Sequence, residues 1–126
     1  MIGYVTIGAL DTAAALPFYD AVLGAIGYER GFFDNGWAGY GPKGSKDQNV
    51  YVCPPNDGEP ARAGNGIMIA FLAPTTDAVD AAYAAGLAQG GRDEGGPGPR
   101  PADSTSFYGA YLRDLTGNKI CVFARP

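Results

Sequence analysis

The sequence of 126 residues contains no histidine. Without imidazole the chain cannot form a Ser-His-Asp or Cys-His catalytic relay, and it has no histidine to act as a general base. It also cannot form a histidine-ligated zinc site, or the site in which two histidines and one carboxylate bind iron. Any chemistry would therefore depend on carboxylates, tyrosines, cysteines, basic side chains or backbone groups.

Basic residues, cysteines and long apolar runs are also scarce. Nine Lys and Arg stand against thirteen Asp and Glu, for a formal net charge of −4, whereas nucleic-acid binding requires a clustered basic surface. No apolar run approaches the roughly 20 residues that span a bilayer, and the N-terminus lacks the positive start of a secretory signal. Two cysteines without such a signal indicate free thiols. We predict an acidic cytoplasmic protein with no nucleic-acid or membrane partner.

The chain contains an internal repeat with an offset of 64 residues, about half its length. When residues 4–31 are laid over residues 68–95, Tyr19 meets Tyr83 and Leu23 meets Leu87. Coincident tyrosines and leucines carry more weight than coincident alanines in this alanine-rich chain. We therefore predict one domain, residues 1–126, built from two copies of one unit, about 1–60 and 61–126.

Each copy is predicted to begin with a short apolar strand followed by a helix. The strands cover residues 2–8 and 66–72, and the helices follow N-caps at Asp11 and at Thr75 or Thr76. Pro17 lacks a backbone donor, so we expect the regular part of the first helix to run mainly after it. Glycines are predicted to end the two helices, at Gly24, Gly27, Gly86, Gly90 and Gly91.

Three further strands are predicted in each copy. They cover about residues 28–33, 36–40 and 49–53 in the first copy; the second has a weak strand after residue 91, then 107–113 and 119–124. A hairpin loop containing Gly117 joins the last two. The segments 54–65 and 95–104 are rich in proline and glycine and are predicted to be long surface loops. The order β-α-β-β-β thus occurs twice, which is an α+β pattern.

Strand alternation separates two faces of each predicted sheet. The side chains placed under the helices are Val5, Ile7, Ile67, Ile69, Phe71, Ile120 and Val122. The opposite face receives Tyr4, Thr6, Met68, Ala70, Cys121 and Phe123. This second set is apolar to weakly polar, which is compatible with a ligand-binding cleft, a dimer interface or ordinary packing.

Three segments, FYDAVLGAIGY (18–28), GNGIM (64–68) and FYGAYLRDLTGNKICVF (107–123), carry a resemblance to a known family. Together with the duplicated order of elements, they make the chain resemble the vicinal oxygen chelate superfamily, which includes glyoxalase I, bleomycin-resistance proteins and extradiol dioxygenases. The resemblance implies an α+β fold in which two βαβββ modules form a curved mixed sheet around a cleft, with the helices on the convex side. It also implies a homodimer.

In the metal-dependent members of this superfamily, the ligands lie on the first strand of each repeat and on later strands. Carried over by position, they fall on Tyr4, Met68 and Cys121, and on one of Tyr51, Val52 and Cys53. A thioether suits Cu(I) and not Mg²⁺, Mn²⁺, Ni²⁺ or Fe²⁺, and a thiolate with a phenolate would make a poor substitute centre. We therefore predict no metal and no other cofactor.

The bleomycin-resistance branch implies that this fold can bind a small molecule without metal, in an aromatic-lined groove usually formed between two subunits. The predicted cleft residues are Tyr4, Thr6, Trp37, Tyr51, Met68, Arg100, Tyr108 and Cys121, with Phe33 and Tyr40 as further candidates for the aromatic lining. Among them Arg100 is the candidate for pairing with an anionic group. No catalytic residue is identified.

Several alternatives stay open at this point. Arg100 could equally be a solvated loop residue, and each ring could belong to the core or the sheet surface. Cys121 is a reactive thiol only if a cation such as Lys119 lowers its pKa, and an inert buried thiol is the simpler interpretation. The chain could also be a glyoxalase-type lyase or isomerase with Asp or Glu ligands, or a structural dimer without a ligand.

Overall fold

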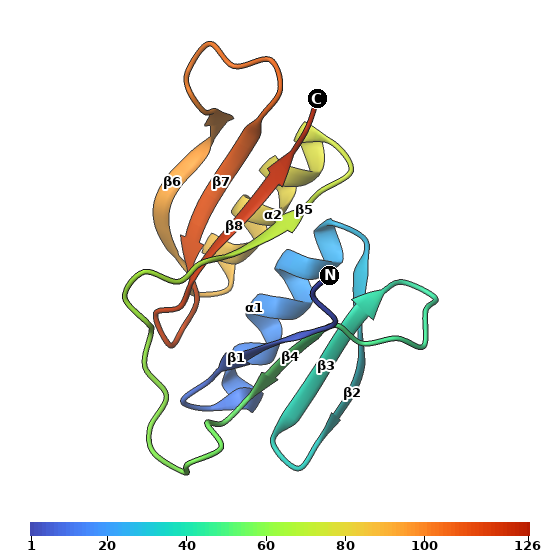
Figure 1. The fold of residues 1–126 in the computed structure, drawn as a ribbon, viewed down its shortest axis with the longest axis vertical. Coiled ribbons are helices and arrows are strands. Elements are labelled where there is room, and N and C mark those ends of the chain that lie inside the picture. The colour runs from blue at the N-terminus through green and yellow to red at the C-terminus, as the bar shows by residue number, and fades with distance from the viewer.

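The computed structural model describes residues 1–126 and repeats one order of elements twice (Figure 1). The elements are β1 (Val5–Gly8), α1 (Thr12–Ala25), β2 (Tyr28–Asp34), β3 (Trp37–Pro42), β4 (Val50–Cys53), β5 (Ile69–Leu72), α2 (Thr76–Ala88), β6 (Arg92–Pro99), β7 (Tyr108–Arg113) and β8 (Lys119–Ala124). We call β1 to β4 with α1 the first module, and β5 to β8 with α2 the second module. Residues 54–68 link them.

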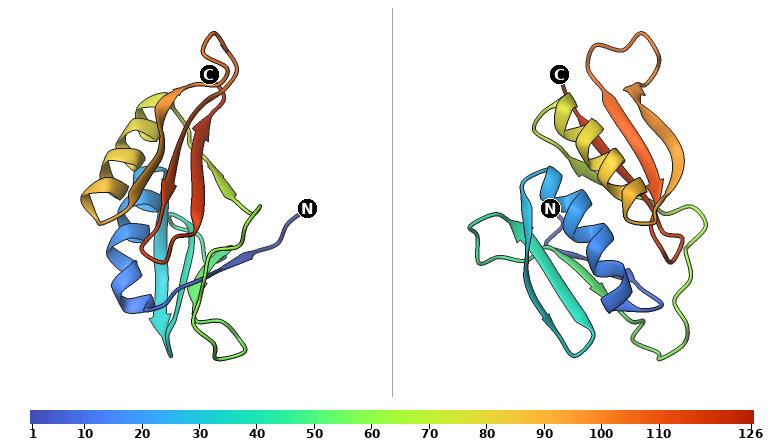
Figure 2. Two further views of the ribbon diagram at one scale, coloured as in Figure 1. Left: turned by 90° about the vertical axis from the view of Figure 1, so that its left-hand side faces the viewer. Right: turned by 180° about the vertical axis from the view of Figure 1, so that it is seen from behind.

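The two modules have equivalent sheets. Strand order is β1-β4-β3-β2 in the first module and β5-β8-β7-β6 in the second. In each sheet the first strand pairs in parallel with the last, and the other pairs are antiparallel. Both helices lie on one side of the sheets (Figure 2), where they pack against each other. The predicted α+β fold of two βαβββ modules is confirmed, and we call the sheet face away from the helices the open face.

A single apolar core lies between the helices and the sheets. It contains 22 buried residues from both modules, because burial beneath a helix requires apolar side chains at alternate strand positions. Phe18, Tyr19, Val22 and Leu23 of α1 are completely buried. No helix of the protein has both the length and the apolar character needed to cross a membrane.

The first helix differs from the prediction at Pro17. Asp11 is the N-cap, and its Oδ1 accepts the amide of Ala14 at 3.2 Å, but α1 is regular on both sides of Pro17. The proline removes the amide that would otherwise donate to the Ala13 carbonyl, and Ala13 is exposed to water. Burial of the α1 core side chains offsets this one lost bond.

Two glycines predicted to end helices lie inside them instead. Gly24 belongs to α1 and Gly86 to α2, whose N-cap is Thr75. A Cβ on Gly86 would lie 2.7 Å from Leu112 Cδ1 and 3.0 Å from Val22 Cγ2. A glycine is therefore required at position 86 because α2 approaches α1 and the second sheet closely there, and not because the helix ends.

Three strand predictions also need correction. The predicted surface loop 95–104 begins inside β6, whose register with β7 shifts on both sides of Gly95. Prolines are tolerated there because β6 is an edge strand, where an amide is not required on the outer side. The strands β1 and β5 begin at Val5 and Ile69, three residues later than predicted. As a result Ile67 does not lie under α2 and is 62% exposed.

A buried aspartate ties the second module to the first. Asp114 Oδ2 accepts the hydroxyl of Tyr19 on α1 at 2.5 Å, and its Oδ1 accepts three backbone amides of its own loop, those of Thr116, Gly117 and Asn118. The Asn118 side chain then donates to the Gly8 carbonyl at the end of β1 at 2.8 Å. The β7–β8 loop thus fixes the relative position of the two modules.

Candidate ligand-binding face

Four aromatic side chains gather on the open face of the first module. Strand register places Thr6, Tyr51 and Gly39 side by side across three strands. The Tyr51 ring lies 5.4 Å from that of Tyr4, 5.9 Å from Trp37 and 6.2 Å from Phe32, between ring centroids. We call Tyr4, Phe32, Trp37 and Tyr51 the aromatic cluster.

The aromatic cluster is open to solvent. Tyr4 is 64% exposed, and Phe32 and Trp37 are each 40% exposed. Gly39 makes room for the cluster, because a Cβ at that position would overlap the Phe32 ring. Contiguous exposed rings of this kind are typical of surfaces that bind other molecules.

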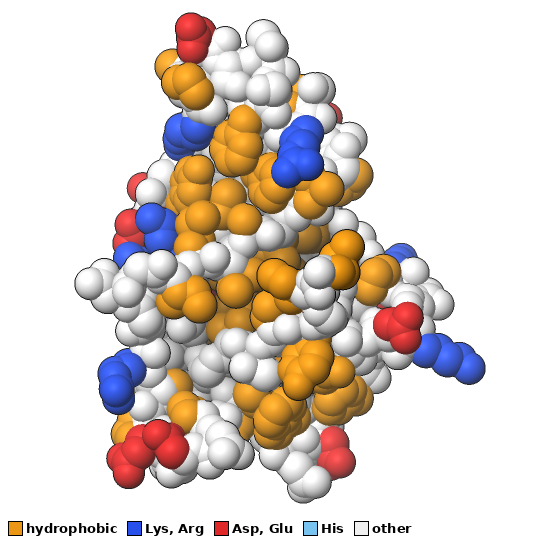
Figure 3. Space-filling view, in the orientation of Figure 1, with side chains coloured by type: hydrophobic (Ala, Val, Ile, Leu, Met, Phe, Trp, Pro, Cys, Tyr) orange, Lys and Arg blue, Asp and Glu red, His pale blue; other side chains and the backbone are white.

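The open face of the second module carries cations over its rings. Tyr111 has the Arg100 guanidinium carbon 5.7 Å and the Lys119 ammonium 5.6 Å from its ring centroid. Phe107 and Phe123 stack at 5.3 Å, and the Arg125 guanidinium carbon lies 5.4 Å from the Phe123 centroid. We call Arg100, Lys119 and Arg125 the cationic cluster. Figure 3 shows apolar side chains along this face over both sheets, with Lys and Arg beside its second-module part.

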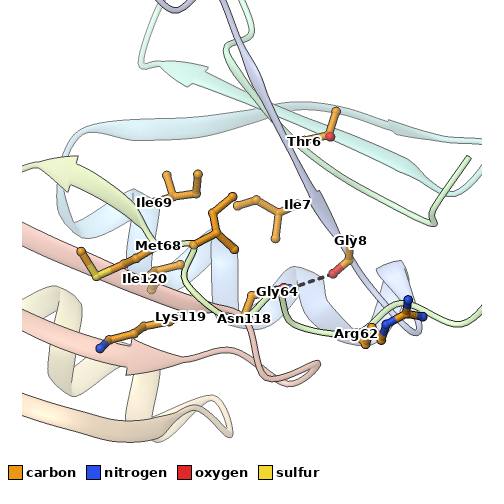
Figure 4. A pocket seen from close by; sticks show the side chains of 11 residues that line it. Thr6, Ile7, Gly8, Arg62, Gly64, Met68, Ile69, Asn118, Lys119 and Ile120 are labelled. Carbon is orange, nitrogen blue, oxygen red and sulfur yellow. Dashed lines mark hydrogen bonds between the residues drawn. The ribbon is translucent and has the colours of Figure 1, made fainter.

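A cavity of about 200 Å³ lies at the seam between the modules (Figure 4). Thr6 and Gly8 line it from β1, Met68 from the linker, and Asn118 and Lys119 from the second module. A wider space of about 530 Å³ adjoins it and shares Met68 and Lys119. Met68 therefore lines two adjoining hollows, one between the modules and one between the linker and the second module.

The strand register also identifies the fourth position at which the superfamily carries a metal ligand. Tyr51 stands opposite Thr6 on β1, as Cys121 stands opposite Ala70 on β5. Val52 is completely buried in the core. Tyr51 is thus the residue of the first module that corresponds to Cys121 in the second.

The four residues at these positions, Tyr4, Tyr51, Met68 and Cys121, do not suit a hard divalent metal. They offer two phenols, a thioether and a thiol, whereas Mg²⁺, Mn²⁺, Ni²⁺ and Fe²⁺ prefer carboxylates, imidazoles and other oxygen ligands. No three Cys, Asp or Glu side chains come together elsewhere in the structure to hold a metal ion. The donor chemistry of the chain therefore does not match the metal site of the family it resembles.

Both cysteines are free and buried. Burial raises the pKa of the Cys53 thiol, and it is also the largest influence on Cys121, where it raises the pKa against the smaller opposing effects of Tyr111, Arg100 and Lys119. A raised pKa disfavours the nucleophilic thiolate. Cys121 therefore lies beside Tyr111 as a neutral thiol and not as a reactive thiolate.

Three of the predicted aromatic residues point to the helix side. Tyr108 donates to Asp80 Oδ1 on α2 at 2.7 Å, and buried Tyr40 donates to Asp20 Oδ1 on α1 at 2.8 Å. Phe33 pairs with Ala38, whose side chain is in the core. The prediction of these three residues rests on their aromatic character and not on strand alternation, and the structure does not bring them to the open face.

The other predicted residues fall into three groups on the open face. Tyr4, Trp37 and Tyr51 belong to the aromatic cluster, Thr6 and Met68 line the seam, and Arg100 and Cys121 lie beside Tyr111. Phe32 and Tyr111 also lie on the open face and were not among the predicted residues. The position of Tyr111 could have been predicted from the sequence, because the short β7–β8 loop fixes the strand register and so places Tyr111 opposite Cys121.

Comparisons with known proteins agree with this geometry. Residues 1–122 match the family model described as "Glyoxalase/Bleomycin resistance protein/Dioxygenase superfamily". A glyoxalase/bleomycin resistance protein from Albidiferax ferrireducens T118 has 38% identity and a TM-score of 0.85, over 98% of this chain and 97% of that one.

A more distant structure, a glyoxalase/bleomycin resistance protein/dioxygenase family enzyme from Burkholderia phytofirmans PsJN, has 19% identity and a TM-score of 0.74, over 99% of this chain and 98% of that one, and supports the fold alone. No protein of curated function matches the chain. The chain belongs to the glyoxalase/bleomycin resistance protein/dioxygenase superfamily.

Proposed function

We propose that this protein binds a small organic molecule on its open face and does so without a divalent metal. The observation that carries the proposal is the aromatic cluster, in which Tyr4, Phe32 and Trp37 remain at least 40% exposed although each of these rings packs beside the ring of Tyr51. Removing a flat ligand and these rings from water together would be favourable. The hollow seam beside Met68 provides concave space next to this surface.

The metal-independent part of the proposal rests on donor chemistry. The positions equivalent to metal ligands hold Tyr4, Tyr51, Met68 and Cys121, which do not form a hard oxygen or imidazole set. Tyr4, Tyr51 and Met68, which are exposed or half-buried, instead extend the surface offered to a ligand. The side chains at these positions suit the binding of an organic molecule. They do not supply the ligands that a metal-assisted reaction of the glyoxalase type would need.

Trp37 is the only tryptophan, so its indole N–H gives a single reporter peak for the aromatic cluster in a ¹H–¹⁵N NMR spectrum. We expect indole-3-acetamide, a flat neutral probe, to move this peak saturably in chelator-treated protein. Tyr4→Ala should weaken binding about three- to tenfold. Phe33→Ala is the matched control, because Phe33 is similarly exposed, at 41%, but lies on the helix side.

Two results would overturn the proposal. One is the absence of any saturable shift, which would favour the structural dimer without a ligand. The other is turnover of a hemithioacetal after addition of Ni²⁺, Zn²⁺ or Mn²⁺, which would support a glyoxalase-type lyase with non-standard ligands.

The homodimer stays part of the proposal. Ile2 and Leu72 are 77% and 56% exposed, and exposed apolar side chains of this size are candidates for a subunit contact. Light scattering at several protein concentrations tests this, with a monomeric mass at all concentrations as the contrary result. The cytoplasmic location predicted from the sequence would be tested by cell fractionation.

A further inference from the structure

The three cations of the cationic cluster form no ion pair within the protein. Only two ion pairs form in the structure, Arg30–Asp20 and Arg113–Glu94. Arg100, Lys119 and Arg125 therefore lack a carboxylate partner within 4.0 Å, although acidic residues outnumber basic ones. All three cations lie over aromatic rings of one sheet face. An acidic protein thus keeps a local surplus of positive charge on the open face of its second module.

The guanidinium of Arg100 is held in place by the backbone. Its Nη2 donates to the Gly96 carbonyl at 2.7 Å and its Nη1 to the Pro99 carbonyl at 3.1 Å. A Cβ on Gly98 would lie 3.0 Å from Nη1 and one on Gly95 would lie 3.5 Å from Nη2, so the glycines of β6 leave the space that Arg100 occupies. A guanidinium has five N–H donors, and those beyond these two bonds have no acceptor in the protein.

Arg100 and Lys119 lie near the same aromatic ring of the open face, that of Tyr111. Both lie less than 6 Å from the centroid of the Tyr111 ring, and Tyr111 stands opposite Cys121 across β7 and β8. Both also lower the pKa of Cys121, opposing the effect of burial. Lys119 further lines the seam cavity beside Met68. Arg100 and Lys119 thus both lie near Tyr111 and Cys121, and Cys121 stands at a position where metal-dependent members of the superfamily carry a ligand.

We propose that the ligand is an organic anion whose carboxylate or other oxyanion binds between Arg100 and Lys119 over the Tyr111 ring. The inference rests on the ligand-binding function proposed above and defines the chemical class of the ligand. Charge-assisted hydrogen bonds from a guanidinium and an ammonium are the strong form of this interaction. The fixed cations of the side chains thus recognise the anionic end, and the rings of the face contact its apolar body.

Two probes of nearly equal shape test the charge requirement. Isothermal titration compares indole-3-acetate with neutral indole-3-acetamide, and we expect the anion to bind at least about tenfold more tightly. Raising the salt concentration should weaken binding of the acetate and leave the acetamide nearly unchanged, because salt screens exposed charges.

Variants assign the preference to the two cations. Lys119→Met retains the aliphatic stem, and it should reduce the ratio of the two dissociation constants severalfold; Arg100→Gln should do the same. Gly98→Ala keeps every charge but displaces the Arg100 guanidinium, so it should also reduce the ratio. Lys43→Met, in the exposed β3–β4 loop and outside both ion pairs, is the matched control and should leave the ratio unchanged. Thermal melts confirm that each variant is folded.

The outcomes separate the two proposals. If both probes bind equally and Lys119→Met changes neither, the anion site is wrong while ligand binding stands. If neither probe binds, the proposed function itself is wrong. If the anion preference is equally lost in Lys43→Met, it arises from general charge and not from this site, which also overturns the inference.

Discussion

The two modules share a backbone plan but present different chemistry on the open face. Strand order and the parallel pairing of first and last strands are the same in both, and their helix-covered faces form one apolar core. The first module exposes uncharged rings around Tyr51, and the second exposes cations around Tyr111. Burial under a helix allows few residue types, whereas the open face is limited only by what lies against it. Duplication therefore provides two halves of one surface that can take different roles.

The largest expected effect concerns the hairpin loop, which is built around a buried aspartate only in the second module. Asp114→Ala should lower the free energy of unfolding by about 3 kcal/mol or more, because the Tyr19 hydroxyl and three backbone amides lose their acceptor. Asp47→Ala, in the corresponding exposed loop of the first module, should change it by less than about 0.5 kcal/mol. Urea unfolding measures both, and equal losses would contradict the distinction between the loops.

The next effect compares the two helices. The repeat sets Gly86 of α2 equivalent to Val22 of α1, and these two residues meet where the helices cross. Gly86→Ala should destabilise the protein by about 1–3 kcal/mol, because its Cβ would enter occupied space. Gly24→Ala in α1 meets nothing within 4 Å and should stabilise by about 0.5–1 kcal/mol through the greater helix propensity of alanine. Two changes of the same sign would show that the crossing is not close-packed as described.

The smallest expected effect uses the equivalent tyrosines Tyr19 and Tyr83. Burial, followed by the charge and hydrogen bond of Asp114, raises the pKa of Tyr19 well above its usual 10.0. The unfolded chain therefore loses this proton first. The stability that Tyr19 provides is fully present below pH 10, declines above it by about 1.4 kcal/mol per pH unit, and is lost as the pH passes through the folded-state pKa.

The pH dependence is tested by comparing the unmodified protein with the variants Tyr19→Phe and Tyr83→Phe. The stability difference between the unmodified protein and Tyr19→Phe should narrow between pH 8 and pH 11, as measured by urea unfolding at each pH. Tyr83→Phe should show a smaller difference throughout, because Tyr83 bonds to Asp93 at the surface. A difference for Tyr19 that stays constant with pH would contradict the assigned cause.

The fold was predictable from the sequence because strand alternation and helix caps are local patterns, and because the repeat indicates that one order of elements occurs twice. Features that depend on irregular backbone were not predictable in the same way. The register shift between Arg30 and Phe32 interrupts alternation in β2, so the position of Phe32 could not be derived by counting. The glycines and prolines of β6 are typical of a loop, and only pairing with β7 makes the segment a strand.

The candidate site was predicted only in part, for a related reason. Side chains chosen by strand alternation, such as Thr6, lie at the seam between the modules. Those chosen for being aromatic, such as Tyr40 and Tyr108, form hydrogen bonds on the helix side. Arg100 was a candidate because of its guanidinium alone, whereas its position over Tyr111 depends on the space above Gly95 and Gly98, which tertiary structure sets.

The loop that contains Asp114 also collects the polar contacts between the two modules. Every hydrogen bond between modules involves residues 114–118, through Leu10 to Thr116, Tyr19 to Asp114, and Asn118 to Gly8. At the other end of the seam, around Tyr4, no hydrogen bond joins the modules. The polar contacts between the modules are therefore concentrated at one end of the seam, and the rest of the junction is held by the apolar core and the packing of α1 against α2.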